Sequence, residues 1–393
     1  MFDWIFKLKN QIHMEARKIA SAFDYLLWFL FDSARIKNLE TRKIKNILVV
    51  LVNQEKGNVG GDFVTLGVLN SFKKQHPQIN LSVFCDRSTI KQFGRAKMMN
   101  FIEYSGKDSL NKLRKKKIQA VVFLNPGNLN TNDFSFIPYR VGTTHFGLRG
   151  LMRRKSFGYT RKTLARIGDH MVGGRFRMFE ALGFKFREKK PFLEFTRQEN
   201  KKADSFIRKN NLSKFIIIHP GGKYVSEAYK EGKWPPHLWN LERYAEVADH
   251  FSQKGYKIVV TGTKSEQILF DEIKKHCRNK EMMINACGML SIREVGCLLK
   301  KTSLLIATDT SIVHLAYQYP INARIVELMG SSIPESVGAW PTDSPRHRIL
   351  VDRGRCYKSM RKLPFRDNYN CLKNIGVDQV INAAESLLKE KQF

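Results

Sequence analysis

Short apolar runs recur along this chain, and each leads into a loop rich in Gly, Ser, Thr or Asp. The first half has such runs at 46–52, 81–85 and 120–125, and the second half has them, with their loops, at 215–222, 256–263, 303–311 and 323–330. Short β-branched runs of this kind are typical of parallel strands that are buried on both faces. Helical stretches separate them, so the sequence predicts α/β units.

The strand pattern stops after the first three runs and then restarts, which predicts two doubly wound, Rossmann-like domains. We expect a helical extension at 1–42, a first domain at 43–195, a second at 196–370 and a C-terminal helix at 371–393. Doubly wound sheets bind their ligands at the carboxyl ends of the strands. Both domains are therefore expected to face one cleft.

The charge of the chain is strongly positive. Lys and Arg number 68 against 36 Asp and Glu, so the formal net charge is +32. A charge of this size favours an anionic partner, which leaves nucleic acid, a membrane surface and a phosphorylated substrate open. Residues 43–195 hold 29 bases and 10 acids, whereas 196–393 hold 32 and 21, so the larger anionic partner is expected at the first domain. An apolar content of 42% excludes wholesale disorder.

The six cysteines contain no CxxC pair, so a zinc site has little support. Cys356 and Cys371 flank a basic loop, which leaves a disulfide between them open. Reduced cytosolic thiols are the preferred interpretation.

The amino-terminal segment does not have the pattern of a signal peptide. Its longest apolar run, 25–31, is well short of the ~20 residues of a membrane span. Residues 2–39 nevertheless predict an amphipathic, aromatic-rich helix or helix pair. Such a helix suits a membrane interface or the surface of the protein itself, and its periodicity does not separate the two.

The residues that could bind a ligand or take part in catalysis follow the strands of the second domain. A helix that begins at a strand end offers free N–H groups to a diphosphate, and Lys233 could add a full positive charge. Glu266 is placed to accept from ribose hydroxyls. The candidate donor-site residues are Gly221, Gly222, Lys233, Glu266, Asp309, Thr310, Ser311 and His314. No acidic pair with metal-ligand spacing lies near them, so positive groups are expected to take the place of a metal, and no cofactor is expected.

Each of these residues also has a purely structural interpretation. The Asp309–Thr–Ser segment makes a good helix N-cap, and Glu266 is an ordinary first-turn acid. A lone His314 would more often be structural. Only the joint occurrence of the motifs, in order, at successive strand ends favours a functional site.

This set of motifs resembles glycosyltransferase family nine, the lipopolysaccharide heptosyltransferases. The matching segments are HPGG at 219–222, KWP at 233–235, GTKSE at 262–266, the run 288–316, MGSSIP at 329–334 and the tail 371–388. In the first half, 45–50 with Gly61–Asp62 and the segment 169–184 are similar to the family's opening strand and to its segment before the linker. The resemblance implies a GT-B fold and a metal-independent, inverting sugar transfer.

The resemblance assigns Asp62 as the general base. From the residues alone, a base and a helix N-cap beside a glycine turn are equally supported. Asp62 is expected in a glycine loop after the first strand, where its carboxylate could take the proton of a sugar hydroxyl. The resemblance also implies that Lys233 and 309–314 hold the diphosphate and that Glu266 holds the ribose.

The segment 151–190 carries twelve Lys or Arg and three acids. Its basic residues could meet the phosphates of a glycolipid acceptor, or they could form a solvated surface. The candidate acceptor residues are His145, Arg149, Arg153, Arg154, Lys155, Arg161 and Lys162.

The sequence thus predicts an enzyme that transfers heptose from ADP-heptose to an anionic lipopolysaccharide-core glycolipid. It would work in the cytoplasm, peripherally at the inner face of the membrane, without specific nucleic acid as a partner. A GT-B enzyme with another nucleotide-sugar donor, a sugar-nucleotide epimerase and an inactive member that only binds a glycan remain alternatives. So does a basic nucleic-acid-binding protein, although no recognised nucleic-acid-binding motif supports it.

Overall fold

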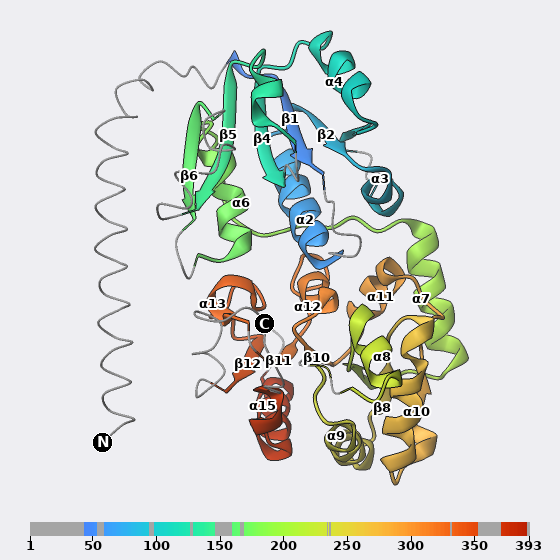
Figure 1. Ribbon diagram of the computed structural model, residues 1–393. Helices are drawn as coiled ribbons and strands as arrows, with labels where there is room; N and C mark the ends of the chain where they lie inside the picture. Colours follow the sequence, from blue (N-terminus) through green and yellow to red (C-terminus); the bar gives the residue numbers. More distant parts are fainter. Residues whose placement is uncertain are drawn as a thin grey trace, which may run out of the picture. The chain divides into compact units, whose positions relative to one another are not determined.

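The computed structural model describes residues 43–52, 59–93, 98–125, 129–145, 159–165, 169–233, 235, 237–330, 332–352 and 371–390. The chain divides into two compact units (Figure 1). The first unit comprises 1–54, 72–169 and 173–189, and the second comprises 55–71, 170–172 and 190–393. The predicted extension 1–42 lies outside the described residues.

The first unit contains a six-stranded sheet in the order β3-β2-β1-β4-β5-β6, with every pair of neighbours parallel. This is the Rossmann order. The strands are β1 (Asn46–Leu51), β2 (Asn80–Cys85), β3 (Asn100–Glu103), β4 (Ala120–Asn125), β5 (Tyr139–His145) and β6 (Arg161–Ala165). The helices are α2 (Val59–Gln75), α3 (Arg87–Phe93), α4 (Lys107–Arg114), η3 (Thr131–Phe134) and α6 (Met171–Glu180). Residues 59–71 of α2 belong to the second unit.

The core of the first sheet follows from its apolar central strands. On one face, side chains of β1, β2 and β4 pack with Leu113 of α4 and Phe134 of η3. Phe72, at the end of α2, stacks on Phe179 of α6 with ring centroids 4.3 Å apart. Burial of both faces is what a parallel sheet requires.

The second unit repeats the same strand order in its own sheet, β12-β11-β10-β7-β8-β9, and all pairs are again parallel. The strands are β7 (Phe215–His219), β8 (Lys257–Val260), β9 (Met283–Asn285), β10 (Leu304–Thr308), β11 (Ile325–Met329) and β12 (His347–Val351). The helices are α7 (Arg197–Lys209), α8 (Lys223–Lys230), α9 (Leu241–Gln253), η5 (Lys264–Glu266), α10 (Gln267–His276), η6 (Lys280–Met282), α11 (Ile292–Leu299), α12 (Ser311–Ala316), α13 (Pro334–Val337), η7 (Cys371–Asn374) and α15 (Val377–Lys389).

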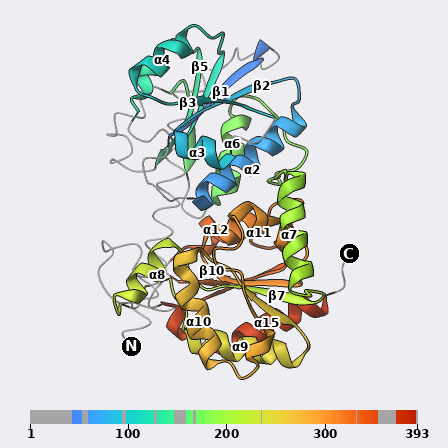
Figure 2. The same cartoon turned by 90° about the vertical axis from the view of Figure 1, so that its right-hand side faces the viewer.

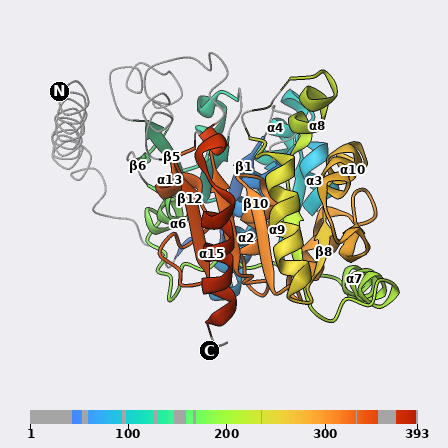
Figure 3. The same cartoon turned by 90° about the horizontal axis from the view of Figure 1, so that it is seen from below.

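Two groups of helices cover the second sheet. Helices α9, α10 and α15 pack on one face, over the apolar side chains of β7, β8, β10 and β11 (Figure 3). Helix α12 contacts β10 and β11, and α11 packs against both α12 and α7 (Figure 2). Among the described residues, no helix combines the length and the apolar character needed to cross a membrane.

The central strands lie where the sequence predicts them, but five further strands were not predicted. Four of these, β3, β6, β9 and β12, are edge strands. An edge strand has one neighbour and less cover, so it need not be a continuous apolar run. The fifth, β5, has the sequence YRVGTTH, which contains strand-favouring Tyr, Val and Thr but no continuous apolar run.

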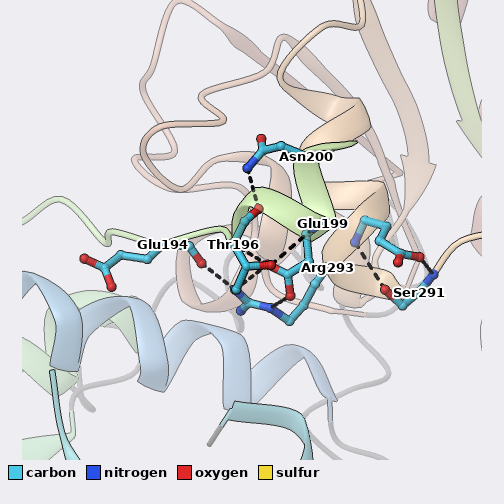
Figure 4. Close-up of polar contacts among 7 residues, drawn as sticks. Glu194, Thr196, Glu199, Asn200, Ser291 and Arg293 are labelled. Atoms are coloured by element: carbon cyan, nitrogen blue, oxygen red, sulfur yellow. Dashed lines mark hydrogen bonds and ion pairs between the residues drawn. The ribbon is translucent and has the colours of Figure 1, made fainter. Parts of the chain in front are cut away.

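Helix α7 is fixed to α11 by a buried ion pair (Figure 4). Arg293 Nε donates to Glu199 Oε1 over 2.7 Å, and its guanidinium also donates to the carbonyl of Glu194. Glu199 Oε2 accepts from the backbone N–H of Thr196, so the same carboxylate completes the capping box of α7. Burial raises the pKa of Glu199, but the hydrogen bonds from Arg293 and Thr196 outweigh it and lower the pKa overall.

We predict that Arg293→Met lowers the free energy of unfolding by about 3 kcal/mol, because it leaves a buried carboxylate unpaired. Urea denaturation at neutral pH measures this loss. The loss should shrink as the pH falls, because Glu199 then takes up a proton in the variant before it does so in the wild type.

The matched control is Lys301→Met, which breaks the exposed ion pair between Lys301 and Asp204 on the same two helical segments. It should cost less than about 1 kcal/mol. Equal losses in the two variants would contradict the role given to the buried pair.

Candidate functional site

The predicted donor-site residues lie in the second unit and, apart from Lys233, at or just beyond the carboxyl ends of its strands. His219 ends β7, and Gly221–Gly222 lead from it into α8. Helix η5 follows β8, and α12 follows β10 after the turn at Asp309. Because all six strands are parallel, these turns lie at one edge of the sheet.

Glu266 is the most constrained of these residues. Its side chain is buried, with 3% exposure. Oε2 accepts from the backbone N–H of Thr263 over 2.6 Å, while Oε1 has no hydrogen-bond partner within the described part of the chain. A buried acceptor without a donor costs free energy. A ligand hydroxyl that reached this oxygen would remove that cost.

Gly221 leaves the space into which Glu266 projects. A Cβ placed on Gly221 would lie 2.9 Å from Glu266 Oε1 and 2.6 Å from Leu269 Cδ1. At the neighbouring Gly222 the nearest atom would be Thr310 Cγ2, at 3.7 Å, which is ordinary contact. The two adjacent glycines therefore have different roles, because only the first must lack a side chain.

His219 supports the same loop. Its Nδ1 lies 3.0 Å from Thr261 Oγ1. Burial lowers the pKa of His219, although the charge of Glu266 acts in the opposite direction. The imidazole is therefore neutral at neutral pH, and it acts here as a buried hydrogen-bonding group beside the glycine turn.

The segment 309–314 forms the start of α12. Thr310 is the N-cap residue but makes no side-chain capping bond, and its hydroxyl donates to the carbonyl of Thr308 instead. Ser311 is half-buried and His314, one turn further along, is buried. These residues present a helix start and a hydroxyl group at the strand edge, as the sequence predicts.

Asp62 lies in helix α2, which corrects the expectation that it lies in a loop. The helix begins at Val59, so Asp62 is in its first turn and is 7% exposed. Gly60, two residues earlier, is close to α12: a Cβ placed there would lie 2.7 Å from His314 Cδ2 and 3.2 Å from Ser311 Cα. Both segments belong to the second unit. The first turn of α2 and the start of α12 are therefore in close contact.

Lys233 forms its ion pair with a residue outside the predicted donor site. Its ammonium pairs with Glu231 over 2.7 Å, and the Lys233 side chain is 73% exposed. The hydrogen bond that Lys233 donates to Glu231, together with the negative charge of Glu231, raises the pKa of Lys233.

The structure describes little of the predicted acceptor residues. His145 ends β5 and Arg161 begins β6, but their side chains, like that of Lys162, lie outside what is described. Arg149, Arg153, Arg154 and Lys155 lie outside the described residues altogether, as does Cys356. In the parts of the chain that are described, no cluster of His, Cys, Asp or Glu could hold a metal ion. Cys85, Cys277, Cys287 and Cys297 are buried free thiols.

The sequence prediction missed Glu327. It is a fully buried carboxyl group on β11, whose pKa is raised well above the ordinary value by burial and by the charge of Asp309. Its sequence signal is an acid in the middle of the apolar run ARIVELMG.

We predict that Gly221→Ala lowers the free energy of unfolding by about 1–3 kcal/mol, because its methyl group overlaps Leu269 and Glu266. Gly222→Ala is the control and should change it by less than about 0.5 kcal/mol. Urea denaturation without ligand compares them. Equal effects at the two positions would contradict the tight packing of Glu266 against Gly221.

Comparison with known proteins finds one matching family model and several relatives. The model of glycosyltransferase family 9 (heptosyltransferase) matches residues 115–367. The chain is 20% identical over 350 residues to lipopolysaccharide heptosyltransferase 3 of Escherichia coli K12, a match that covers 84% of this chain and 96% of that protein. It is 23% identical over 184 residues to lipooligosaccharide heptosyltransferase 2 of Campylobacter jejuni, which is 47% of this chain and only 54% of that relative.

The fold is also shared with a solved structure. The E. coli ADP-heptose lipopolysaccharide heptosyltransferase II has a TM-score of 0.62 and 16% identity to this chain, with 88% of this chain and 98% of that chain covered. Together with the two Rossmann-ordered sheets, this likeness confirms the predicted GT-B fold class. The family match covers well over half of the sequence. The chain therefore belongs to glycosyltransferase family 9, the heptosyltransferase family.

Proposed function

We propose that this chain transfers a heptose from ADP-heptose to an anionic acceptor of the lipopolysaccharide-core type. The observation that carries the proposal is the strand edge of the second unit. A buried carboxylate with an unsatisfied oxygen and a helix start meet there, in a chain of this family. The proposed donor follows the E. coli relative whose title names ADP-heptose.

In this proposal the strand-edge residues hold the nucleoside diphosphate. Glu266 Oε1 accepts from a ribose hydroxyl, which gives that buried oxygen its missing donor. The N–H groups at the start of α12, with the hydroxyl groups of Thr310 and Ser311 and with His314, face the diphosphate. The exposed ammonium of Lys233 would have to exchange Glu231 for phosphate when the donor binds. No metal is required, because these groups neutralise the leaving diphosphate.

Asp62 is proposed as the general base. Its carboxylate takes the proton of the acceptor hydroxyl while that oxygen forms a bond to the anomeric carbon of the donor sugar. The bond from that carbon to the phosphate oxygen breaks, and its electron pair leaves with the nucleoside diphosphate. Attack on the face opposite the leaving group inverts the configuration, through a transition state with oxocarbenium character. The contact of Gly60 with α12 supports this role, because it brings the first turn of α2 to the donor motifs.

We predict that Asp62→Asn lowers kcat by at least about 100-fold, because general-base assistance contributes 10²–10⁴-fold, and leaves ADP affinity within about threefold. A transfer assay and isothermal titration calorimetry measure these two effects. Full retention of the wild-type rate would remove Asp62 as the base. Loss of ADP binding together with activity would point to a structural role instead.

The proposed partner of the first unit is an anionic membrane surface on the cytoplasmic side. The basic edge consists of seven exposed residues: Lys43, Lys45, Lys112, Arg114, Lys115, Lys116 and Lys117. Gln119 joins its two segments, since its side chain accepts from Lys45 N–H over 2.7 Å and donates to the carbonyl of Lys43 over 2.6 Å. No acid occurs in 43–54 or 109–132.

The basic edge precedes β1 and β4, so it lies at the amino ends of these strands. Contact with a membrane there leaves the carboxyl ends of the same strands uncovered. Basic clusters of this size are attracted to anionic lipid headgroups.

We predict that the triple change Lys115→Gln, Lys116→Gln and Lys117→Gln weakens binding to anionic vesicles on the order of 100-fold, from about 1 kcal/mol per lysine. Vesicle flotation with phosphatidylglycerol against phosphatidylcholine measures it. The control changes the exposed Lys201, Lys202 and Lys209 of α7 to Gln, which removes the same charge elsewhere. Equal losses in both triples would show that net charge, and not this edge, attracts the vesicle.

A further inference from the structure

Glu327 and Asp309 are placed on the same face of the second sheet by the strand register. Strand β11 pairs with β10 so that Glu327 is opposite Ala307. Side chains two residues apart on a strand point to the same face, so Asp309 follows Ala307 on the side of Glu327. The N–H of Asp309 still donates to the carbonyl of Leu328, at 3.3 Å, and so continues the ladder. Ala307, which has a small side chain, is the residue before Asp309 on that face of the strand.

The two oxygens of Glu327 have different surroundings. Oε2 accepts from the backbone N–H of Ala339 over 2.8 Å. Oε1 is buried and has no hydrogen-bond partner within the described part of the chain. An ionised carboxylate in this position would be desolvated and adjacent to a second carboxylate, which is costly. Burial first, and the charge of Asp309 second, raise the pKa of Glu327 well above its ordinary value. Burial and the neighbouring Asp309 therefore both favour the un-ionised form of Glu327.

The segment that Glu327 contacts is held at three points. His170 Nε2 donates to the carbonyl of Gly338 over 2.8 Å, since its Nδ1 accepts from the N–H of Val172. The ring of His170 also lies against Trp340, with centroids 4.6 Å apart. On the other side, His347 Nδ1 lies 3.1 Å from the carbonyl of Pro341. Burial lowers the pKa of His347 to about 4, so it too is neutral.

We infer that Glu327 is a positioning residue for the Asp309 turn: its carboxyl group, on the same sheet face as Asp309, ties the 338–341 segment to β11. The un-ionised form of this carboxyl group keeps a second negative charge away from the strand end that opens α12. The charge of Asp309 acts on Glu327, and His170 and His347 hydrogen-bond to backbone carbonyls of the 338–341 segment. The inference rests on the proposed function in one respect, namely that the Asp309 turn receives a diphosphate. A negative charge on Glu327 would repel both the diphosphate and the carboxylate of Asp309.

The first test uses proton linkage in the ligand-free protein, with Glu327→Gln as the conservative variant. Gln keeps the acceptor for Ala339 and cannot ionise. Above the ordinary glutamate pKa the unfolded chain has lost this proton and the native protein retains it, so the wild type loses stability as the pH rises. The ratio of wild-type to Glu327→Gln folding constants should fall about tenfold per pH unit from pH 5 to 7.

A flat ratio across that range, or a Glu327→Gln protein that is much less stable than the wild type at pH 7, would overturn the inference. Either result would mean that Glu327 is a carboxylate in the native protein. This measurement needs no ligand, so it stands even if the proposed function is wrong.

The second test separates positioning from stability. Glu327→Leu removes both oxygens, and amide hydrogen exchange then reports each segment. We expect exchange to accelerate at least tenfold at both 338–341 and 309–314, and ADP to bind at least tenfold more weakly by calorimetry. Glu327→Gln should stay within threefold of the wild type in both measurements.

Faster exchange at 338–341 alone, with 309–314 and ADP affinity unchanged, would reduce Glu327 to a local packing role and so overturn the inference. If Glu327→Leu does not fold, the pH dependence of Glu327→Gln against the wild type alone decides whether the inference stands. Failure of the wild type to bind ADP would contradict the proposed donor, and the linkage and exchange results would still decide the role of Glu327.

Discussion

Every strand of both sheets runs parallel to its neighbours, and the rest of the structure depends on this constraint. A parallel strand needs a crossover, so each strand end is followed by a turn and then, in most cases, by a helix start. These turns gather at one edge of the sheet. In the second unit that edge carries Gly221, Glu266 and Asp309, which come from three separate parts of the sequence. The candidate site therefore depends on the topology of the sheet, because no single segment of the sequence contains all of its residues.

Three buried carboxyl groups of the second unit differ in their hydrogen-bond and ion-pair partners. Glu199 is ionised and paired with Arg293, so it joins α7 to α11. Glu327 has no ion pair within the described residues, and burial raises its pKa, which favours the un-ionised form. Glu266 keeps one oxygen on a backbone N–H and leaves the other without a partner in the described chain. Burying such groups costs free energy unless a partner compensates. The paired Glu199 stabilises the unit. Glu266, with one oxygen that lacks a partner in the described chain, is where a ligand hydroxyl would be accommodated.

The sequence predicts the central strands and the turns that follow them in the second unit, because both depend on local patterns. Strand β4, at Ala120–Asn125, is predicted to the residue, since its apolar run is bounded by polar residues. The edge strands and β5 are not predicted, because partial burial allows polar side chains such as Thr143 and Arg348. The helical position of Asp62 depends on contact with α12, which no local pattern reveals. Glu327 becomes significant only through the register that places it beside Asp309.

The central claim is that the strand edge of the second unit binds a nucleoside diphosphate without a metal. A thermal-shift series with ADP, UDP, GDP and CMP, each with and without magnesium, tests it most directly. A ligand at 100 times its Kd should stabilise the protein by about 2.7 kcal/mol, which is a shift of several degrees. We expect ADP to raise the Tm, equally with and without magnesium. A protein that responds to none of the four, or to ADP only when magnesium is present, would contradict it.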